Sequence, residues 1–397
     1  MEWNPASRRP LVRGDMGMRL LTLCYEFPPL GGGGARVVHG LSRELVRLGH
    51  EVDVITMGWD GLPRDEVVEG VQVHRVPCAR RARHVCTGRE ALSYLLAATP
   101  LALKLARQRR YDLNHTHFIF PDGVIAWLLR RRTGLPYVIT AHGSDVPGYN
   151  PHRLRLAHRL LAPGWRAVVH DAAHLICPSE TIRSLVLRQQ AESKITRISN
   201  GTDPDRFRPT ADGSGILSVC KMFERKGIQH LLRALEGVPL EQEVQIVGDG
   251  PYLPTLEELA ARTRVPVRFS RWLDHGSVEL TQLYERSGIF VLPSESENFP
   301  ISLLEAMSAG LAIVTTQGTG CAEVVGEAAL LVPPKDVDAL RAALVRLICN
   351  PDLRASLGAA ARRRVVENFG WPVIAQQYLA LYGHHVHHSR APETTLV

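Results

Sequence analysis

The chain has 397 residues, of which 45% are hydrophobic and 22% are charged, an ordinary composition for a globular protein. This length exceeds the roughly 250 to 300 residues at which a single hydrophobic core stops growing, so we expect two domains. The first 200 residues hold 28 Arg and Lys against 17 Asp and Glu, whereas the remainder is slightly acidic. Neither a basic motif interleaved with aromatic residues nor a helix-turn-helix pattern accompanies this charge, which argues against a nucleic-acid partner.

Three further observations bear on compartment and class. The seven cysteines are scattered and form no C-x-x-C pair, which argues against a disulfide framework and a zinc site and indicates a reducing compartment. Residues 1–17 are polar and lack the apolar segment of a secretory signal, so we interpret them as a loose leader. Since no run of about 18 apolar residues occurs, a membrane span is not expected. These features predict a cytoplasmic protein that binds no metal.

The first half of the chain alternates strand and helix patterns. An apolar strand at 18–23 precedes four consecutive glycines, Gly31 to Gly34, and a helix at 35–48 leads to a second strand at 52–56. This βαβ unit predicts a parallel sheet, and adjacent glycines permit a close backbone approach to a sugar or phosphate. Further strands are expected at 71–76, 111–118, 137–140 and 173–177.

Histidines follow two of these strands. His115 and His117 lie in the segment 111–118, and His142 comes directly after 137–140, flanked by Gly143. Open α/β sheets bind ligands at the carboxyl ends of their strands. We expect His142 to reach into a cleft as a hydrogen-bond donor or as a proton carrier near neutral pH, and His115 and His117 to be packed.

The positive charge of the first half suggests a membrane surface as a partner. Several leucines lie among the basic residues as they do in an interfacial helix, namely Leu95, Leu96, Leu101, Leu103 and Leu105. Anionic lipid would attract such a surface, so we expect a protein that is peripheral at the inner face of the membrane; the alternative is a solvated face. The clusters are Arg80, Arg81, Arg83 and Arg89; Lys104, Arg107, Arg109 and Arg110; Arg130 to Arg132; and Arg153, Arg155 and Arg159.

A run of turn-forming residues from Ser199 to Asp205 predicts a linker between two domains. A second alternating series follows it, so two similar α/β domains are expected to face each other. Its strands are expected at 216–220, 244–247, 267–269, 289–292, 312–315 and 329–332.

Two lysines stand out in the second half. The chain has five lysines against 42 arginines, yet Lys221 and Lys226 both fall in the loop after the strand at 216–220. A compact ammonium group neutralises the charge that develops on a departing diphosphate. Gly248 closes the next strand with a tight turn that suits backbone contact with a ligand, although such turns are common in loops.

Two carboxylates follow the strand at 289–292. Glu297 lies in the turn after this strand, and Glu305 follows eight positions later in a segment that ends at Gly310. The helix start between them suits a phosphorylated group, and flanking carboxylates suit sugar hydroxyls. The stretch therefore indicates a nucleotide sugar, against the alternative of a charged surface loop.

Taken together, these motifs resemble glycosyltransferase family 4, the retaining nucleotide-sugar transferases of GT-B fold, from about residue 18 to 382. The likeness rests on the pair Glu297 and Glu305, on Gly33-Gly34, on Asn200-Gly201-Thr202-Asp203, on Lys226-Gly227 and on Trp371. It implies an α/β protein with two facing Rossmann-like parallel-sheet domains and a C-terminal helix that returns to the first. The expected boundaries are 18–203 for the acceptor-side domain, 204–368 for the nucleotide-sugar domain, 369–383 for the return helix and 384–397 for a disordered tail containing histidines.

The resemblance also implies a role for each motif. Glu297 would bond the hydroxyls of the donor sugar, Glu305 the ribose, and Lys221 with Lys226 the diphosphate. His142 would lie beside the transferring sugar. The remaining expected donor contacts are Gly33, Gly34, Gly248, Asn298, Phe299, Pro300, Ile301 and Ser302. The implied reaction moves a hexose from a UDP- or GDP-linked donor to a glycan, a lipid-linked acceptor or a small molecule, with no cofactor required.

Three positions depart from the family pattern. Cys220-Lys221 stands where the family usually has Gly-Arg, so that a point charge replaces a guanidinium clamp. Arg271 stands where relatives often have glycine near the nucleobase, which leaves the base open. Pro300 replaces a glycine seen in many members and removes one N–H donor.

Two other classes of function stay open at this stage. An NAD-dependent oxidoreductase would use the glycine loop with Asp53, but its motif requires G-x-G-x-x-G spacing and leaves the lysines and glutamates unexplained. The other alternative is a non-catalytic protein that binds sugar nucleotides. The C-terminal histidines could bind metal, although an uninvolved chain end is the favoured interpretation.

Overall fold

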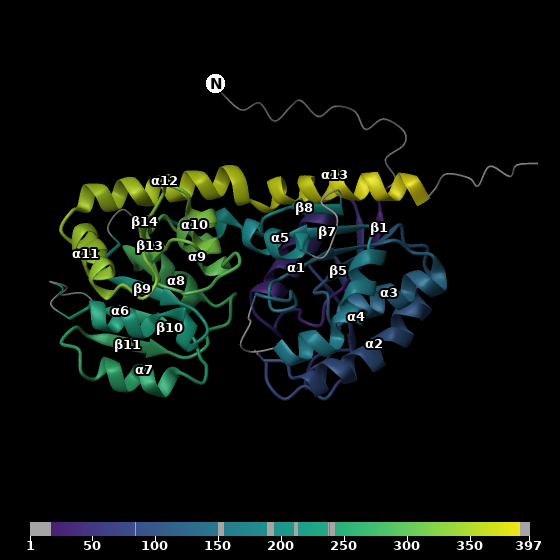
Figure 1. Cartoon of the computed structure of the whole chain (residues 1–397). Helices are drawn as coiled ribbons and strands as arrows, with labels where there is room; N and C mark the ends of the chain where they lie inside the picture. Colours follow the sequence, from purple (N-terminus) through teal and green to yellow (C-terminus); the bar gives the residue numbers. More distant parts are fainter. Residues whose placement is uncertain are drawn as a thin grey trace, which may run out of the picture.

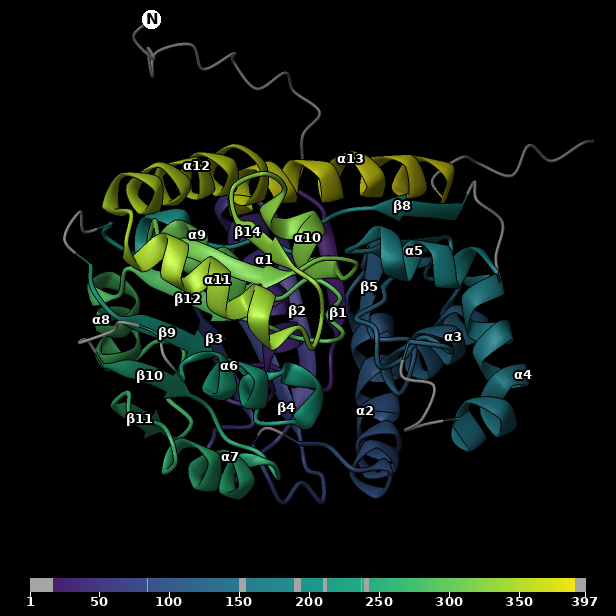
Figure 2. The same ribbon diagram turned by 60° about the vertical axis from the view of Figure 1, so that its left-hand side comes forward.

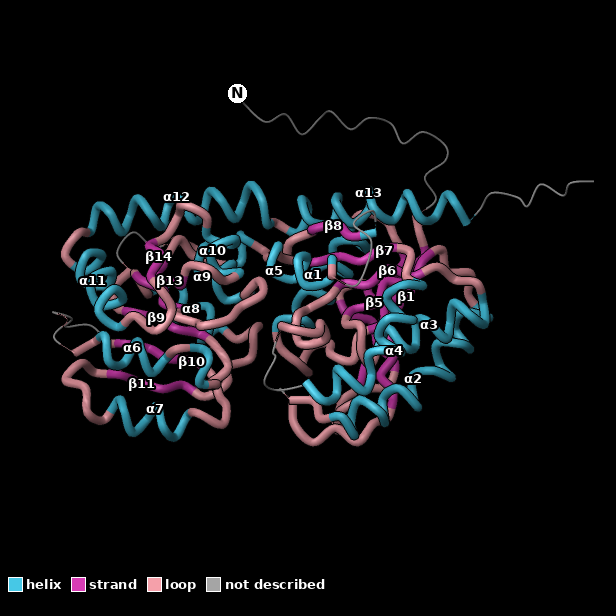
Figure 3. The backbone as a smooth tube through the Cα atoms, in the orientation of Figure 1, coloured by secondary structure: helices cyan, strands magenta, loops and turns pink. Residues whose placement is uncertain are grey.

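The computed structural model describes residues 17–83, 85–149, 155–188, 194–209, 213–236, 238 and 243–389; for 155–161 and 387–389 only the backbone is described. Figure 1 shows two lobes side by side, with two helices laid end to end along one edge of both. In each lobe the strands form a central sheet with helices on its faces (Figure 3). The two α/β domains predicted from the sequence are confirmed.

The first lobe is built on an eight-stranded sheet in the order β3-β4-β2-β1-β5-β6-β7-β8, parallel except for the β3 and β4 pair. Its strands are β1 Arg19–Leu23, β2 Glu51–Met57, β3 Asp65–Val68, β4 Val71–Val76, β5 Leu113–His117, β6 Tyr137–Thr140, β7 His174–Cys177 and β8 Ile195–Arg197. Its helices are α1 Gly33–Arg47, α2 Gly88–Gln108, α3 Asp122–Thr133, α4 Arg155–Asp171 and α5 Glu180–Leu187.

The second lobe is built on a six-stranded parallel sheet in the order β11-β10-β9-β12-β13-β14. Its strands are β9 Ile216–Val219, β10 Val244–Val247, β11 Val267–Ser270, β12 Ile289–Leu292, β13 Ala312–Thr316 and β14 Leu330–Val332. Its helices are α6 Ile228–Ala234, α7 Leu253–Ala260, α8 Val278–Arg286, α9 Ile301–Ser308, α10 Gly320–Val325, α11 Val337–Ile348 and α12 Pro351–Phe369. Single turns of 3-10 helix lie at Pro204–Arg206 and Glu224–Lys226.

The order of the strands explains where the site lies. In the first sheet β1 neighbours both β2 and β5, and in the second β9 neighbours both β10 and β12, so each sheet reverses its strand order at these places. The loops that leave adjacent strands at such a point diverge and leave a crevice at the carboxyl ends. The loops after β1, β9 and β12 carry the glycine run, the two lysines and Glu297, and His117 is the last residue of β5.

The chain crosses between the lobes twice, and the two crossing segments are bonded to each other. The Thr202 N–H donates to the Phe369 carbonyl at 2.9 Å, and the Trp371 N–H donates to the Thr202 carbonyl at 3.1 Å. The indole of Trp371 lies between Gly40 of α1 and Gly201, where an added Cβ would come within 2.2 and 2.5 Å of its ring. Figure 2, a view from another direction, again shows α12 and α13 lying along one edge of the molecule.

The last helix corrects two expected boundaries. Helix α13 spans Trp371–Ser389, so the residues 384–389 that we expected in a disordered tail are helical. Val386 is buried against the first lobe, which explains why the helix continues past Gly383. Residues 390–397 of the expected tail and 1–16 of the expected leader lie outside the described residues.

Two strands were not predicted, and each has a physical reason. Strand β3 is an antiparallel edge strand of acidic and valine residues whose burial alternates, with Val67 largely exposed. Strand β8 has only three residues. Both are too short for a periodic pattern to show.

Helix α2 corrects the expected interfacial face. Leu105 is buried, and Leu95, Leu101 and Leu103 pack against the core of the first lobe, so of the five leucines only Leu96 is exposed. Within the described part of the chain, no helix combines the length and the apolar character needed to cross a membrane.

Candidate active site

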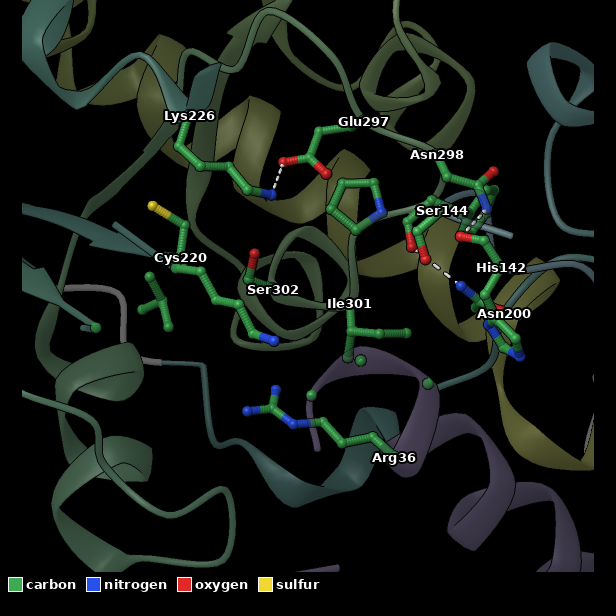
Figure 4. Close-up of a pocket in the computed structure, with 18 of the residues that line it drawn as sticks. Arg36, His142, Ser144, Asn200, Cys220, Lys226, Glu297, Asn298, Ile301 and Ser302 are labelled. Carbon is green, nitrogen blue, oxygen red and sulfur yellow. Dashed lines mark hydrogen bonds and ion pairs between the residues drawn. The ribbon is translucent and has the colours of Figure 1, made fainter. Parts of the chain in front are cut away.

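A cavity of about 330 Å³ lies between the two lobes, at the carboxyl ends of both sheets (Figure 4). Every residue that we expected at the site lines this cavity, except Glu305. The residues on the first-lobe side are Tyr25, Glu26, Gly32, Gly33, Gly34, Arg36, Phe118, His142, Ser144 and Tyr149. Those on the second-lobe side include Cys220, Lys221, Arg225, Lys226, Gly248, Trp272, Glu297, Asn298, Phe299, Pro300, Ile301 and Ser302.

Lys226 and Glu297 form an ion pair at this cavity. Lys226 ends a 3-10 turn after β9, and its Nζ donates to Oε1 of Glu297, which also accepts from the Ser294 hydroxyl at 2.9 Å. Figure 4 shows the two side chains pointing toward each other. Because both are largely buried and both line the cavity, one ligand could contact the cation and the carboxylate together.

Lys221 lies against the glycine loop of the opposite lobe. A Cβ added to Gly32 would lie 3.2 Å from the Lys221 Nζ, so the absence of a side chain allows this approach. Burial lowers the pKa of Lys221, while the charge of Glu26 acts to raise it. The cavity therefore holds two ammonium groups, and Lys221 faces a carboxylate of the first lobe.

The loop after β10 has a backbone that requires glycine. Gly248 has a φ of +143°, and a Cβ at this position would lie 1.9 Å from the carbonyl oxygen of Cys220. The two loops can thus pack together only without a side chain. Burial raises the pKa of the Cys220 thiol to about 12, so that it stays protonated in the cavity wall.

Helix α9 begins at the cavity wall. Phe299, Pro300 and Ile301 line the cavity, and no side chain caps the helix at Pro300. The first N–H groups of a helix lack partners within it and carry partial positive charge, which favours an anionic ligand. This helix is buried on nearly all sides.

Glu305 lies deeper, in a network that joins both lobes. Its Oε1 accepts from Arg36 of α1 at 3.0 Å and lies 2.8 Å from Nδ1 of His275, and its Oε2 accepts from the Tyr284 hydroxyl at 2.9 Å. Burial acts to raise the pKa of Glu305, but the attraction of Arg36 and His275 outweighs it and holds that pKa well below its usual range. Oε1 therefore has two close partners and Oε2 has one.

His142 is held in place by its own loop and by His117. The Asp145 carboxylate accepts from the N–H groups of His142 and Gly143 at 3.1 and 2.8 Å, and the His142 Nε2 lies 3.1 Å from Nδ1 of His117. Burial lowers the pKa of His142 to about 3. This pKa places the ring in its neutral form near neutral pH, which favours the expected role as a hydrogen-bonding group over that of a proton carrier.

Asn298 joins the two lobes with its side chain. Its Nδ2 donates to the His142 carbonyl at 3.1 Å (Figure 4). Its Oδ1 accepts from the Ser179 hydroxyl at 2.5 Å. The amide thus holds the Glu297 loop against the first lobe. Asn200 of the linker supports the same loop by donating to the Phe299 carbonyl at 3.0 Å.

Sequence reasoning missed several residues of the site. Glu26 and Arg36 flank the glycine loop, and their signal was their place directly after a buried strand and at the start of a helix. Arg271 does not line this cavity; it is exposed, with Asp249 at 3.6 Å, and Trp272 takes its place in the wall. Tyr149 lies in a loop that no local pattern connects with the cavity.

Comparison with known families identifies the chain. The model of Glycosyltransferase Family 4 matches residues 31–206, and the model of Glycosyl transferases group 1 matches residues 203–364. The chain belongs to glycosyltransferase family 4. As a member, it is a retaining enzyme that transfers a sugar from a nucleotide sugar.

Relatives of this glycosyltransferase span nearly its whole length. It is 29% identical to a glycogen synthase of Mycobacterium tuberculosis over 91% of its chain and 95% of the relative. It is 28% identical to a GDP-mannose-dependent alpha-(1-6)-phosphatidylinositol monomannoside mannosyltransferase of Mycolicibacterium smegmatis, over 89% of its chain and 95% of the relative. The solved sucrose-phosphate synthase from Thermosynechococcus elongatus superposes with a TM-score of 0.78 at 24% identity, covering 92% and 98% of the two chains. The fold is GT-B.

Proposed function

We propose that this glycosyltransferase moves a hexose from a UDP- or GDP-linked donor bound between the lobes, without a metal or other cofactor. The observation that carries this proposal is the gathering of Lys221, Lys226 and Glu297 around one cavity. Two ammonium groups match the two charges of a diphosphate, and a carboxylate beside them matches the hydroxyls of the sugar attached to it.

Each group then has one task in the transfer. Lys221 and Lys226 stabilise the diphosphate as its oxygen leaves the anomeric carbon, and Glu297 accepts hydrogen bonds from the sugar hydroxyls. The acceptor oxygen bonds to that carbon from the same face, and its proton passes to the departing phosphate oxygen. Neutral His142 lies beside the sugar as a hydrogen-bonding group, because an imidazole with a pKa of about 3 is too weak a base for the acceptor.

Glu305 holds the donor ribose in this proposal. Oε1 already has Arg36 and His275 as partners, so the ribose hydroxyls either bond to Oε2 or replace one of these two groups. Gly33 and Gly34 line the first-lobe side of the cavity, where their backbone permits close approach to the donor. The backbone of residues 298–302 then contacts sugar and phosphate.

A donor screen tests this function. Purified protein is incubated with UDP- and GDP-sugars and an acceptor panel of glycans, lipid-linked sugars and small polyols, and released nucleoside diphosphate is measured. Release with one donor, abolished in Glu297→Ala, is the expected result. Absence of release across the panel, with donor binding still seen by calorimetry, would instead favour a non-catalytic sugar-nucleotide-binding protein; tight NADH binding would favour an oxidoreductase.

We further propose that the first lobe meets an anionic membrane surface, at the cytoplasmic face, to reach a lipid-linked acceptor. Exposed residues of α2 at helical spacing support this: Leu92 and Leu96 are 54% and 67% exposed, and Arg89, Lys104 and Arg107 share their side of the helix. Arg80 does not contribute, because it is buried and bonds to backbone carbonyls. Side chains of the expected cluster at 153–159 lie outside those described.

Vesicle sedimentation tests the membrane contact. The protein is expected to pellet with anionic vesicles at low salt and to release at high salt, and Leu92→Asp with Leu96→Asp should weaken pelleting. Val278→Asp is the matched control, since Val278 is 71% exposed on the other lobe. If both variants pellet equally, or if the native protein does not pellet at low salt, the proposed membrane contact is wrong.

A further inference from the structure

A buried chain of rings leads from the cavity to the last helix. It begins at His142 on the cavity wall, continues through His117 and His115 of β5, and ends at Tyr382 of α13. His115 and His117 are two positions apart in one strand, so both side chains extend to the same face of the sheet. Both are 1% exposed, and Tyr382 is fully buried.

The contact between His117 and His142 restricts both rings. A neutral imidazole carries one proton on one of its two nitrogens. Nδ1 of His117 and Nε2 of His142 lie 3.1 Å apart, so one of these nitrogens must donate a hydrogen bond and the other must accept it. The two nitrogens therefore cannot both be protonated, and they cannot both be unprotonated. The rings are also stacked, with centroids 5.3 Å apart. The proton position of His142 is therefore coupled to that of His117, and its ring orientation depends on the same contact.

The other end of the chain holds His115. Its Nδ1 lies 2.7 Å from the Tyr382 hydroxyl, and its Nε2 lies 2.8 Å from the Thr140 hydroxyl, so both nitrogens have partners. Tyr378 of α13 adds a contact to Thr140 at 3.3 Å. The fixed ring of His115 lies 4.1 Å from that of His117, centroid to centroid, and limits its rotation.

We propose that His117 is a positioning residue for His142, and that Tyr382 supports it through His115. This inference rests on the proposed function, in which His142 lies beside the transferring sugar. None of the three residues behind His142 lines the cavity, so they act through it and not on the substrate. Burial holds all three imidazoles neutral at physiological pH, which keeps the arrangement constant.

Three variants test the positioning role by kinetics. His117→Leu should lower kcat on the order of 10- to 100-fold with little change in the donor KM, since misplacement of a group beside the reacting atoms costs rate more than binding. His117→Asn keeps a polar atom near the position of Nδ1 and should recover most of kcat. Tyr382→Phe should lower kcat less than His117→Leu does.

His174→Leu is the matched control for burial. His174 is 8% exposed in β7 of the same sheet, its Nε2 lies 2.7 Å from the Thr196 hydroxyl, and it does not line the cavity. It should lower the free energy of unfolding as His117→Leu does while leaving kcat unchanged. If His117→Leu lowers kcat no more than this control, the positioning role is wrong.

Nitrogen NMR of histidine-labelled full-length protein gives a readout that does not need turnover. The tautomer ratio of the His142 ring, assigned by comparison with His142→Asn, should stay close to the native value in His117→Asn and should change in His117→Leu. An unchanged His142 spectrum in His117→Leu would overturn the proposal. If the native protein transfers no sugar at all, the proposed function fails, and the tautomer measurement still decides the positioning of His142.

Discussion

Among single residues, Lys226 has the largest expected effect on the proposed reaction. Its ammonium pairs with Glu297, which keeps that carboxylate compatible with a site intended for a diphosphate. Without the lysine, Glu297 would keep only the hydrogen bond from the Ser294 hydroxyl. Its negative charge would then repel the diphosphate of the donor. In the proposed function, the same cation therefore binds the donor and stabilises the leaving group.

We predict that Lys226→Ala lowers kcat by about 10²- to 10³-fold, the usual cost of removing one preorganised group that stabilises developing charge. Lys335→Ala is the matched control, because Lys335 pairs with Glu295 of the same loop at 3.0 Å but is exposed and does not line the cavity. Steady-state release of nucleoside diphosphate measures both. Equal kcat values in the two variants would mean that Lys226 takes no part in the reaction.

The residues that sequence reasoning found share one property. Lys226, Glu297 and Gly248 each follow a predictable buried strand, so their local pattern places them at the same edge of one sheet. The pairing of Arg36 with Glu305 could not be found in this way, because the two residues lie 269 positions apart in the chain. The sequence could not predict that His142 is neutral either, because its low pKa depends on the packing of His117 and Phe118 against the ring.

Among the elements, α13 does most to hold the lobes in one arrangement. It covers the first sheet with Ile374, Tyr378 and Tyr382, although the chain reaches it from the second lobe. Local composition suggested that the helix ends near Gly383, yet it continues to Ser389. Tertiary packing of Val386 outweighs the weak helix propensity of the histidines, which no local pattern could show.

Gly40 should be intolerant of a side chain because α1 packs against the start of α13. A Cβ on Gly40 would lie 2.2 Å from the Trp371 ring, so Gly40→Ala should lower the free energy of unfolding by about 1 to 3 kcal/mol through overpacking. Gly383→Ala in α13 is the control, because a Cβ there meets no atom within 4 Å, and it should be neutral or stabilising. Urea unfolding measures both; equal midpoints would contradict the packing argument.

On the scale of the whole molecule, the lobes are joined by polar contacts across the cavity. Besides the Arg36 to Glu305 and Asn298 contacts, the Glu323 carboxylate accepts from the N–H groups of Glu180 and Thr181 at 2.8 and 3.3 Å. These N–H groups begin α5, where a negative charge is favourable. The two lobes are thus held together in part by hydrogen bonds and an ion pair.

Stability should fall steeply in mild acid. Burial lowers the pKa of His115 and His142 to about 3 and that of His117 well below its usual range, so the unfolded chain binds more protons below pH about 6.5. The free energy of unfolding then decreases with falling pH, by up to about 1.4 kcal/mol per pH unit for each such histidine, until the folded-state pKa values are reached. Urea unfolding at several pH values between about 7.5 and 4.5 measures this, and a flat profile would contradict it.

The return of α13 to the first lobe bears on how the protein is made. The strands of the first sheet leave the ribosome early, but the helix that covers part of that sheet is the last of the described elements to be synthesised. At about 5 to 20 residues per second, the interval from Arg197 to Ser389 lasts roughly 10 to 40 s. During that time the surface that later receives Tyr378 and Tyr382 lacks its cover on the nascent chain.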